Sequence, residues 1–382
     1  MDIPTFKDMF AQIRYNFHIL GIPLQYDKKI NIKFYLLVTC LFLVLVEEIS
    51  FFVIKISTNN FLELTQLAPC IGVGVLSILK VCSIAYKRNK IIKLSESLDK
   101  LYSDLLIDPP KTQIIKKDML TLKLVMKYYF ILNGILISVY NFSTLIFAVY
   151  NCMVNKQFTF RLPYAVIVPF STETWVNWSI VYIHLIIAGF TCVLFFTTVD
   201  SLYCVFSCYI CNNFVILGKA IENMEKADIE QLREIIINHQ YILNLSEDLE
   251  DIFNVSNLFN VLVGSFEICA LGFNLTSGNW SQMPGCILFL FSVLLRILTM
   301  CFFGEQIVTE STKVGHCVYL SKWYEMENNI KKMLLVIMIR AHKPQKLTAY
   351  KFSTITYKTF TKIISTSWTY FTLLRTVYNP VE

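Results

Sequence analysis

The segment Phe352–Tyr378 reads FSTITYKTFTKIISTSWTYFTLLRTVY, and four residues follow it. It is long enough for a helix that crosses a bilayer, which takes about 20 residues. Serine and threonine recur along it, and two lysines, Lys358 and Lys362, lie one helical turn apart. Polar side chains in a membrane helix are typical of surfaces that line water. The segment therefore predicts a membrane span that lines a pore, with no further domain expected behind it.

The whole chain has the composition of an integral membrane protein. Hydrophobic residues make up 55% of it and charged residues 16%, with a mean hydropathy of +0.53, whereas soluble domains carry about 25% charged residues. Apolar windows of membrane-crossing length lie near 34–54, 63–86, 124–150, 176–206, 257–275, 284–308 and 352–376. We therefore predict an all-α membrane protein with seven transmembrane helices in a single domain, residues 1–382.

The positions of lysine and arginine predict the orientation of these spans, because cytoplasmic loops carry an excess of both residues. Twenty-five lie in the N-terminal segment and in the segments after spans two, four and six, and four lie on the other side. This bias predicts a cytoplasmic N-terminus and an extracellular C-terminus, the reverse of a G-protein-coupled receptor. The net charge of +6 then reflects contact with anionic membrane lipids, and no nucleic-acid partner is expected.

Two segments extend beyond what the membrane needs. In 207–256, apolar and acidic residues alternate with helical periodicity, and the apolar stripe favours packing against neighbouring helices over a solvated connector. In 309–349, the apolar run Met333–Ile339 is too short to cross a bilayer, and Pro344 ends it. Together the two segments predict a cytoplasmic helical anchor layer in which subunits meet.

Signatures of catalysis are absent from the sequence. It contains no H-E-x-x-H, no Walker loop and no G-x-S-x-G, so we expect no enzyme and no cofactor. Cys204, Cys208 and Cys211 share a helical face, but no histidine lies near them, which favours small buried hydrophobes over a metal site. A disulfide between Cys152 and Cys286 is left open by the sequence. Glycosylation sequons begin at Asn274 and Asn279.

Several ionisable residues lie within the spans. They are Glu47, Glu48, Asp200, Glu267 and Arg296. A charged group at such a depth indicates function by default, and a position at a helix interface or an aqueous margin is the alternative. A transporter would show interrupted spans at matching places in two halves, and this chain shows no such symmetry.

The outer halves of spans two, three and four are rich in aromatic and small polar residues. An apolar cavity with a few polar groups is how small-molecule sites are built. An aromatic belt at the membrane surface is the alternative, but Tyr140 and His184 lie too far inside for it. Chosen by depth and helical face, the candidate ligand-binding residues are Leu67, Cys70, Ile71, Leu136, Tyr140, Ser143, Thr144, Tyr182, His184 and Ile186.

Leu373 and Val377 lie four residues apart at the outer end of the last span, on one helical face. In a symmetric assembly such side chains form an aliphatic ring that blocks ions by dewetting and opens by a small displacement. Thr369 and Thr376 flank this face. These four residues are the candidate pore and gate, and ordinary helix packing is the alternative.

Several short motifs follow one another along the chain. The most specific is Thr369–Arg375, TYFTLLR, in the last span. The others are Leu162–Tyr164 with Pro169, Asp200–Leu202, Glu310–Ser311, Trp323–Tyr324 and Arg340–Pro344. In these motifs and in their order the chain resembles the insect odorant receptors. The Gln-Phe ending of the taste-receptor relatives is missing, and the family's co-receptor is longer between spans four and five. The chain therefore looks like a tuning subunit.

The resemblance implies an odorant-gated, nonselective cation channel, a heterotetramer with a co-receptor subunit in the plasma membrane of olfactory sensory neurons. It implies that the last span lines the pore, with an aliphatic gate at positions that match Leu373 and Val377. It also implies that a small volatile or lipid-like ligand binds among the outer halves of the spans. The alternatives are a G-protein-coupled or gustatory-type chemoreceptor and, less favoured, a transporter.

Overall fold

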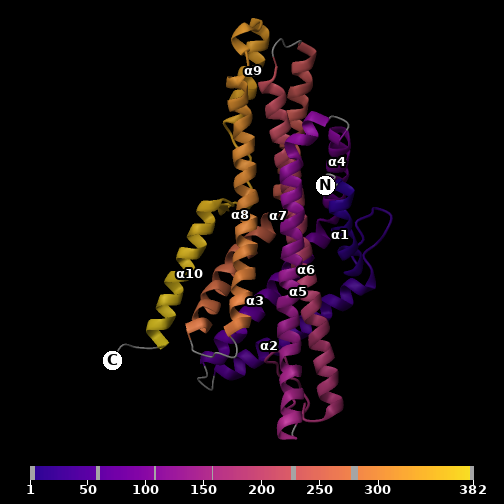
Figure 1. The fold of residues 1–382 in the computed structure, drawn as a ribbon, viewed down its shortest axis with the longest axis vertical. Coiled ribbons are helices and arrows are strands. Elements are labelled where there is room, and N and C mark those ends of the chain that lie inside the picture. Colours follow the sequence, from indigo (N-terminus) through magenta and orange to yellow (C-terminus); the bar gives the residue numbers. More distant parts are fainter. Residues whose placement is uncertain are drawn as a thin grey trace.

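The computed structural model describes residues 5–56, 61–106, 109–156, 158–224, 229–276 and 283–378, and nearly all of these are helical (Figure 1). The helices are α1 (Phe6–Ile19), α2 (Ile32–Ile56), α3 (Phe61–Tyr86), α4 (Arg88–Leu106), α5 (Pro109–Asn155), α6 (Trp175–Glu222), α7 (Ile229–Thr276), α8 (Met283–Leu320), the 3-10 turn η1 (Trp323–Glu325), α9 (Asn328–Ala341) and α10 (Tyr357–Tyr378). Two short antiparallel strands, β1 (Thr348–Ala349) and β2 (Ser353–Thr354), precede α10.

Seven of these helices correspond to the predicted spans. Among the described residues, α2, α3, α5, α6, α7 and α8 are both long and apolar enough to cross a membrane. The seventh, α10, has 22 residues, and its serines, threonines and lysines make it more polar than the other six. It begins at Tyr357 rather than at 352, because Ser353 and Thr354 pair with Ala349 and Thr348 in the hairpin.

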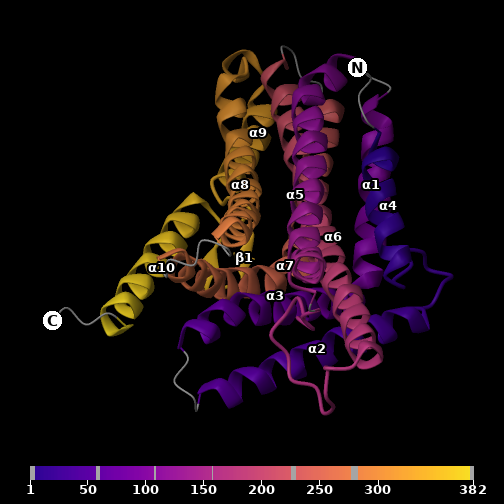
Figure 2. The same cartoon turned by 60° about the horizontal axis from the view of Figure 1, so that its bottom comes forward.

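The helices α6 and α7 are much longer than a bilayer requires. Each has 48 residues, about 70 Å at 1.5 Å per residue, against a hydrocarbon core of about 30 Å. Their surplus, with the ends of α5 and α8 and with α9, forms a helical layer at one end of the molecule (Figures 1 and 2). The predicted apolar stripe is packed there, since Leu232 and Ile235 of α7 and Leu334 of α9 are buried. The charge distribution assigns this end to the cytoplasm.

The central helix of the bundle is α6, which contacts α1, α2, α3, α4, α5, α7 and α8. Its side chains are buried along most of its length. The N-terminal helix α1 covers its inner half, where the ring of Phe6 packs edge-on against Tyr209 at 4.9 Å between ring centres. A capping box starts α1: Thr5 Oγ1 accepts from the Asp8 amide, and the Asp8 carboxylate accepts from the Thr5 amide.

Two buried ion pairs connect the helices in the interior. Lys80 Nζ of α3 lies 2.5 Å from Asp200 Oδ1 of α6, and the Tyr129 hydroxyl of α5 donates to Asp200 Oδ2 at 3.0 Å. Arg296 of α8 donates to the carboxylate of Glu267 of α7. The side chains of Lys80 and Glu267 are 0% exposed. Asp200, Glu267 and Arg296 therefore occupy helix interfaces, and sequence reasoning did not identify their companion Lys80.

The hairpin holds the segment that leads into α10. The Glu250 carboxylate of α7 accepts hydrogen bonds from the backbone amide of Thr348, at 2.7 Å, and from its hydroxyl. The carbonyl oxygen of Ile355 lies directly against Gly304 of α8, where any side chain would collide with it. After this anchor point α10 runs along α7 and α8 at the flank of the molecule (Figure 1).

We predict that Lys80→Met and Asp200→Asn each destabilise the protein by about 3–5 kcal/mol, because each leaves its partner buried without a counter-charge. The double variant should lose much less than the sum of the two single losses. Thermal unfolding of the purified protein in detergent measures the loss of stability in the two single variants and in the double variant. Lys127→Met, which alters an exposed lysine of α5, is the matched control and should change little. Strictly additive losses would contradict the direct pairing.

Candidate functional site

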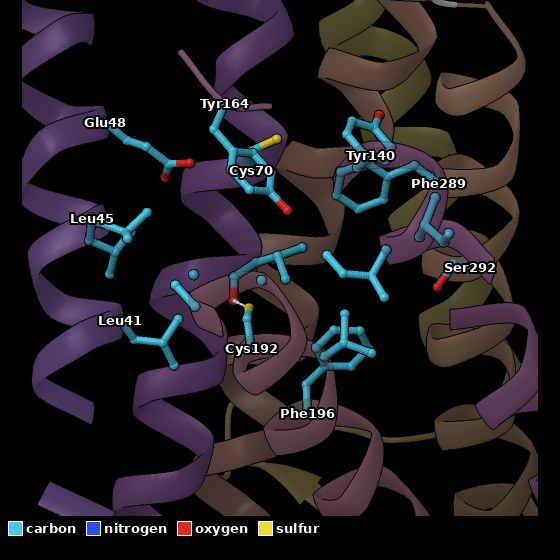
Figure 3. Close-up of a pocket in the computed structure, with 18 of the residues that line it drawn as sticks. Leu41, Leu45, Glu48, Cys70, Tyr140, Tyr164, Cys192, Phe196, Phe289 and Ser292 are labelled. Carbon is cyan, nitrogen blue, oxygen red and sulfur yellow. Dashed lines mark hydrogen bonds between the residues drawn. The ribbon is translucent and has the colours of Figure 1, made fainter. Parts of the chain in front are cut away.

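A cavity of about 90 Å³ lies inside the bundle, between α2, α3, α5, α6 and α8 (Figure 3). Most of its walls are aliphatic or aromatic, for example Leu45 of α2, Phe196 of α6 and Phe289 of α8. Its polar groups are few and come from α2, α5, α8 and the segment between α5 and α6. They are Glu48, Tyr140, Tyr164, Ser292 and Arg296. An apolar chamber with a small number of polar groups is the usual form of a small-molecule site.

A second, wider cavity of about 900 Å³ adjoins the first. Its lining is more polar and includes Gln66, Arg161 and Asn274. Both cavities share four wall residues, Cys70, Tyr140, Tyr164 and Phe289. These four side chains therefore stand between an inner chamber and an outer vestibule.

Hydrogen bonds hold Tyr164 in this partition. Tyr164 lies in the segment between α5 and α6, and its hydroxyl donates to Asn141 Oδ1 of α5 at 2.9 Å. The hydroxyl of Tyr182 of α6 donates to the carbonyl oxygen of the same Asn141 at 2.5 Å. A Cβ at Gly189 would lie 2.7 Å from the Tyr164 hydroxyl. Glycine at this position thus allows the loop to approach α6 and close the chamber.

The predicted ligand-binding residues are divided between these cavities. Cys70, Leu136 and Tyr140 line the inner cavity. Leu67, Ser143 and Thr144 line the outer vestibule, which Cys70 and Tyr140 also reach. Six of the ten therefore line one or both of these adjoining cavities, and the other four are not among the described residues that line either of them. These four are Ile71, Tyr182, His184 and Ile186.

Three of the remaining four have other surroundings in the structure. Tyr182 is buried and stacks on Trp178, with ring centres 4.8 Å apart. His184 faces α2, where its Nε2 lies 4.0 Å from Glu47 Oε1. Ile186 lines a shallow groove between α1, α2 and α6. The helical faces of these residues therefore point away from the chamber.

Sequence reasoning missed the wall that α2 contributes. Leu41, Val44, Leu45 and Glu48 of α2 all line the inner cavity. The span reads as apolar on every side, so periodicity does not mark one face. Its one informative signal is the carboxyl group of Glu48, because an ionisable side chain inside a span usually faces the protein interior or a cavity.

The candidate gate lies on the exposed face of α10. The opposite face is buried against α7 and α8 through Thr359, Ile363, Ser367 and Phe371. Leu373 is 60% exposed, and Thr369 and Thr376 are exposed as well. The side chain of Val377 lies outside the described part of the structure.

Lys358 and Lys362 are exposed on the same side of α10 as Leu373. Lys362 precedes Leu373 by eleven residues, which is about three helical turns. The two lysines and the candidate gate therefore share one face of the helix, at its opposite ends.

The structure also describes the surroundings of other residues singled out in the sequence. Cys204, Cys208 and Cys211 are buried, and the described residues contain no group of His, Cys, Asp and Glu that could hold a metal ion. Cys152 and Cys286 are both free thiols. The side-chain amide of Asn274 is buried, and the nitrogen to which a glycan would be attached donates to the carbonyl of Thr65 at 2.9 Å. The second sequon, at Asn279, lies outside the described residues.

The fold defines the chain as a multi-pass helical membrane protein, and solved structures share this fold. The olfactory receptor OR5 from Machilis hrabei, solved in complex with eugenol, superposes with a TM-score of 0.84 over 97% of both chains, at 20% sequence identity. A further structure of the same receptor superposes with a TM-score of 0.82 over 96% of this chain and 97% of the receptor chain, at 19% sequence identity.

Sequence comparison identifies the family. The chain is 28% identical to the putative odorant receptor 85d of Drosophila melanogaster over 348 residues, which cover 88% of this chain and 84% of the relative. It is 29% identical to odorant receptor 85b of the same fly over 332 residues, 84% of each chain. The profile of the family described as 7tm Odorant receptor matches residues 60–368. The chain therefore belongs to the 7tm odorant receptor family, and it is a receptor of olfaction rather than an enzyme.

Proposed function

We propose that this chain is the odorant-binding subunit of a ligand-gated, nonselective cation channel. It would form a heterotetramer with a co-receptor subunit in the plasma membrane of olfactory sensory neurons. The observation that carries the proposal is the inner cavity, because its apolar walls and few polar groups suit a small odorant or pheromone. The complex of the similarly folded OR5 with eugenol supports a small-molecule ligand.

The exposed face of α10 supports the channel part of the proposal. This face carries threonines and lysines, which are poorly suited to lipid and well suited to water. In a tetramer with α10 nearest the symmetry axis, Leu373 and its counterparts would form an aliphatic ring at the outer end. Such a ring excludes ions while it is dry and narrow, and ligand binding would favour the wider state.

The lysines on this face make conduction depend on the partner subunits. Lys358 and Lys362 lie at the cytoplasmic end of the same face, where ammonium groups repel permeant cations. Four copies of this chain would place eight such charges around the mouth of the pore. In a heterotetramer the co-receptor subunits reduce this number, so the proposal gives the co-receptor a physical role in permeation.

We predict that Gly189→Ala lowers the potency of an activating odorant by about tenfold, because the added methyl group displaces the Tyr164 hydroxyl and narrows the inner cavity. The odorant is first identified by screening volatiles and cuticular lipids on cells that also express the co-receptor. Dose–response curves of the evoked current then measure the potency. Gly134→Ala is the matched control, since a Cβ at Gly134 has no neighbour within 4 Å.

Equal potency of the Gly189→Ala and Gly134→Ala variants, at equal surface expression, would contradict binding in this cavity. An odorant-evoked current that vanishes when G-protein signalling is blocked would support the metabotropic alternative instead.

We predict that Leu373→Ala and Val377→Ala each change the permeability ratio or the rectification of the evoked current, because they shorten the side chains of the proposed aliphatic ring. Reversal potentials in solutions of different cations measure this change. Leu374→Ala is the matched control, because Leu374 is half-buried and packs beside Phe371. Unchanged permeation in both gate variants, or an equal change in the control, would contradict the assignment of this face to the pore.

A further inference from the structure

Glu48 stands out among the residues of the inner cavity. It is 4% exposed, on the α2 wall, and its carboxylate points from that wall toward Tyr164 and Cys70 (Figure 3). Within the described part of the chain, no hydrogen bond or ion pair reaches this carboxylate. A buried carboxylate without a partner is strongly unfavourable in an apolar environment. The arrangement therefore leaves a specific interaction unmade inside the ligand chamber.

The other charges at this depth do not supply the missing partner. Lys80 is bound by Asp200, and Arg296 is bound by Glu267. Arg296 also lines the inner cavity, but it comes from α8, on another wall than Glu48. No salt bridge joins the two within the described residues, so the carboxyl group of Glu48 has no charged partner when the chamber is empty.

We propose that Glu48 recognises a short alkyl amine, and that this chain is tuned to basic nitrogen compounds. The inference rests on the function proposed above and names the chemical class of its ligand. An amine beside Glu48 would hold its proton as an ammonium group and form a charge-assisted hydrogen bond with the carboxylate, and that pair carries no net charge. The alkyl part would contact the leucine and phenylalanine walls.

The dimensions and the aromatic lining fit this class of ligand. A cavity of about 90 Å³ is smaller than the roughly 150 Å³ apolar cavity that accommodates benzene, so it favours molecules of a few heavy atoms. Tyr140 and Tyr164 also line the chamber, and aromatic rings attract ammonium groups through their π faces.

Other ligand classes suit the chamber less well. A carboxylic acid would bring a second acidic group near Glu48, and the cation in the chamber, Arg296, already shares one of its terminal nitrogens with Glu267. A hydrocarbon of the same size would fill the space but leave the carboxylate unpaired. A short alcohol could donate one hydrogen bond without supplying a charge. Selectivity for the amine over its alcohol and hydrocarbon analogues is therefore the expected signature.

The experiment compares butylamine, 1-butanol and butyric acid on cells that express this chain with the co-receptor. For the unaltered chain, butylamine should be the most potent of the three. Glu48→Gln keeps the size of the side chain and removes its charge, and it should raise the half-maximal butylamine concentration at least tenfold. For a larger neutral odorant found by screening, the half-maximal concentration of the same variant should stay within about threefold of the value for the unaltered chain. Glu47→Gln is the matched control, since Glu47 precedes Glu48 on α2 but is not among the residues that line the cavity.

Two readouts keep the result interpretable. Surface labelling shows whether Glu48→Gln reaches the membrane, and thermal stabilisation of the purified chain by butylamine measures binding without channel opening. Equal butylamine potency in Glu48→Gln and the unaltered chain would overturn the inference, as would no response to any amine. If neutral odorants still activate the channel and Gly189→Ala lowers their potency, the proposed function stands and only the amine assignment fails. If no ligand evokes current or stabilises the chain, the proposed function itself fails.

Discussion

The two buried ion pairs, Lys80–Asp200 and Arg296–Glu267, constrain the arrangement of the whole helical bundle. In a low-dielectric interior each of these charges needs its partner at contact distance, so α3 is held to α6 and α7 to α8 in one register. The Tyr129 hydroxyl adds α5 to the first pair. Since Arg296 also lines the inner cavity, these contacts help to position one of its walls. The apolar surfaces around α6 then fill the remaining space.

The same contacts connect the cavity with α10. Arg296 reaches the chamber with its side chain and binds Glu267 of α7. Close by on α7, the carbonyl oxygen of Ser265 accepts a hydrogen bond from Ser367 of α10 at 2.9 Å, and Phe273 packs against Phe371. Under the proposed function, a ligand that displaces Arg296 would act on α7, and α7 would carry that displacement to the face opposite Leu373. The route consists of direct contacts along a single helix, which makes it testable by substitution.

The order and type of the elements could be predicted because apolar length and charge asymmetry are local properties of the sequence. The beginning of α10 could not, because β2 depends on pairing with Thr348, which Glu250 holds from a distant helix. For the site, the helical face that each side chain takes could not be predicted. Tyr140 faces the chamber, whereas His184 faces α2. Glu48 was visible as a charge in a span, but its lack of a partner emerges only when every neighbouring helix is in place.

Cysteine accessibility along α10 tests most directly whether the face that carries Leu373 lines an ion pathway controlled by the ligand. Single cysteines at Thr369, Leu373 and Thr376 are compared with cysteines at the buried positions Ile363 and Ser367, in a chain whose exposed Cys82 and Cys152 are replaced by serine. A charged, water-soluble thiol reagent should reduce the odorant-evoked current only in the first set, and it should react faster at Leu373→Cys when odorant is present. Modification at the buried positions alone, or modification of the exposed face that leaves the current and its ligand dependence unchanged, would contradict the account.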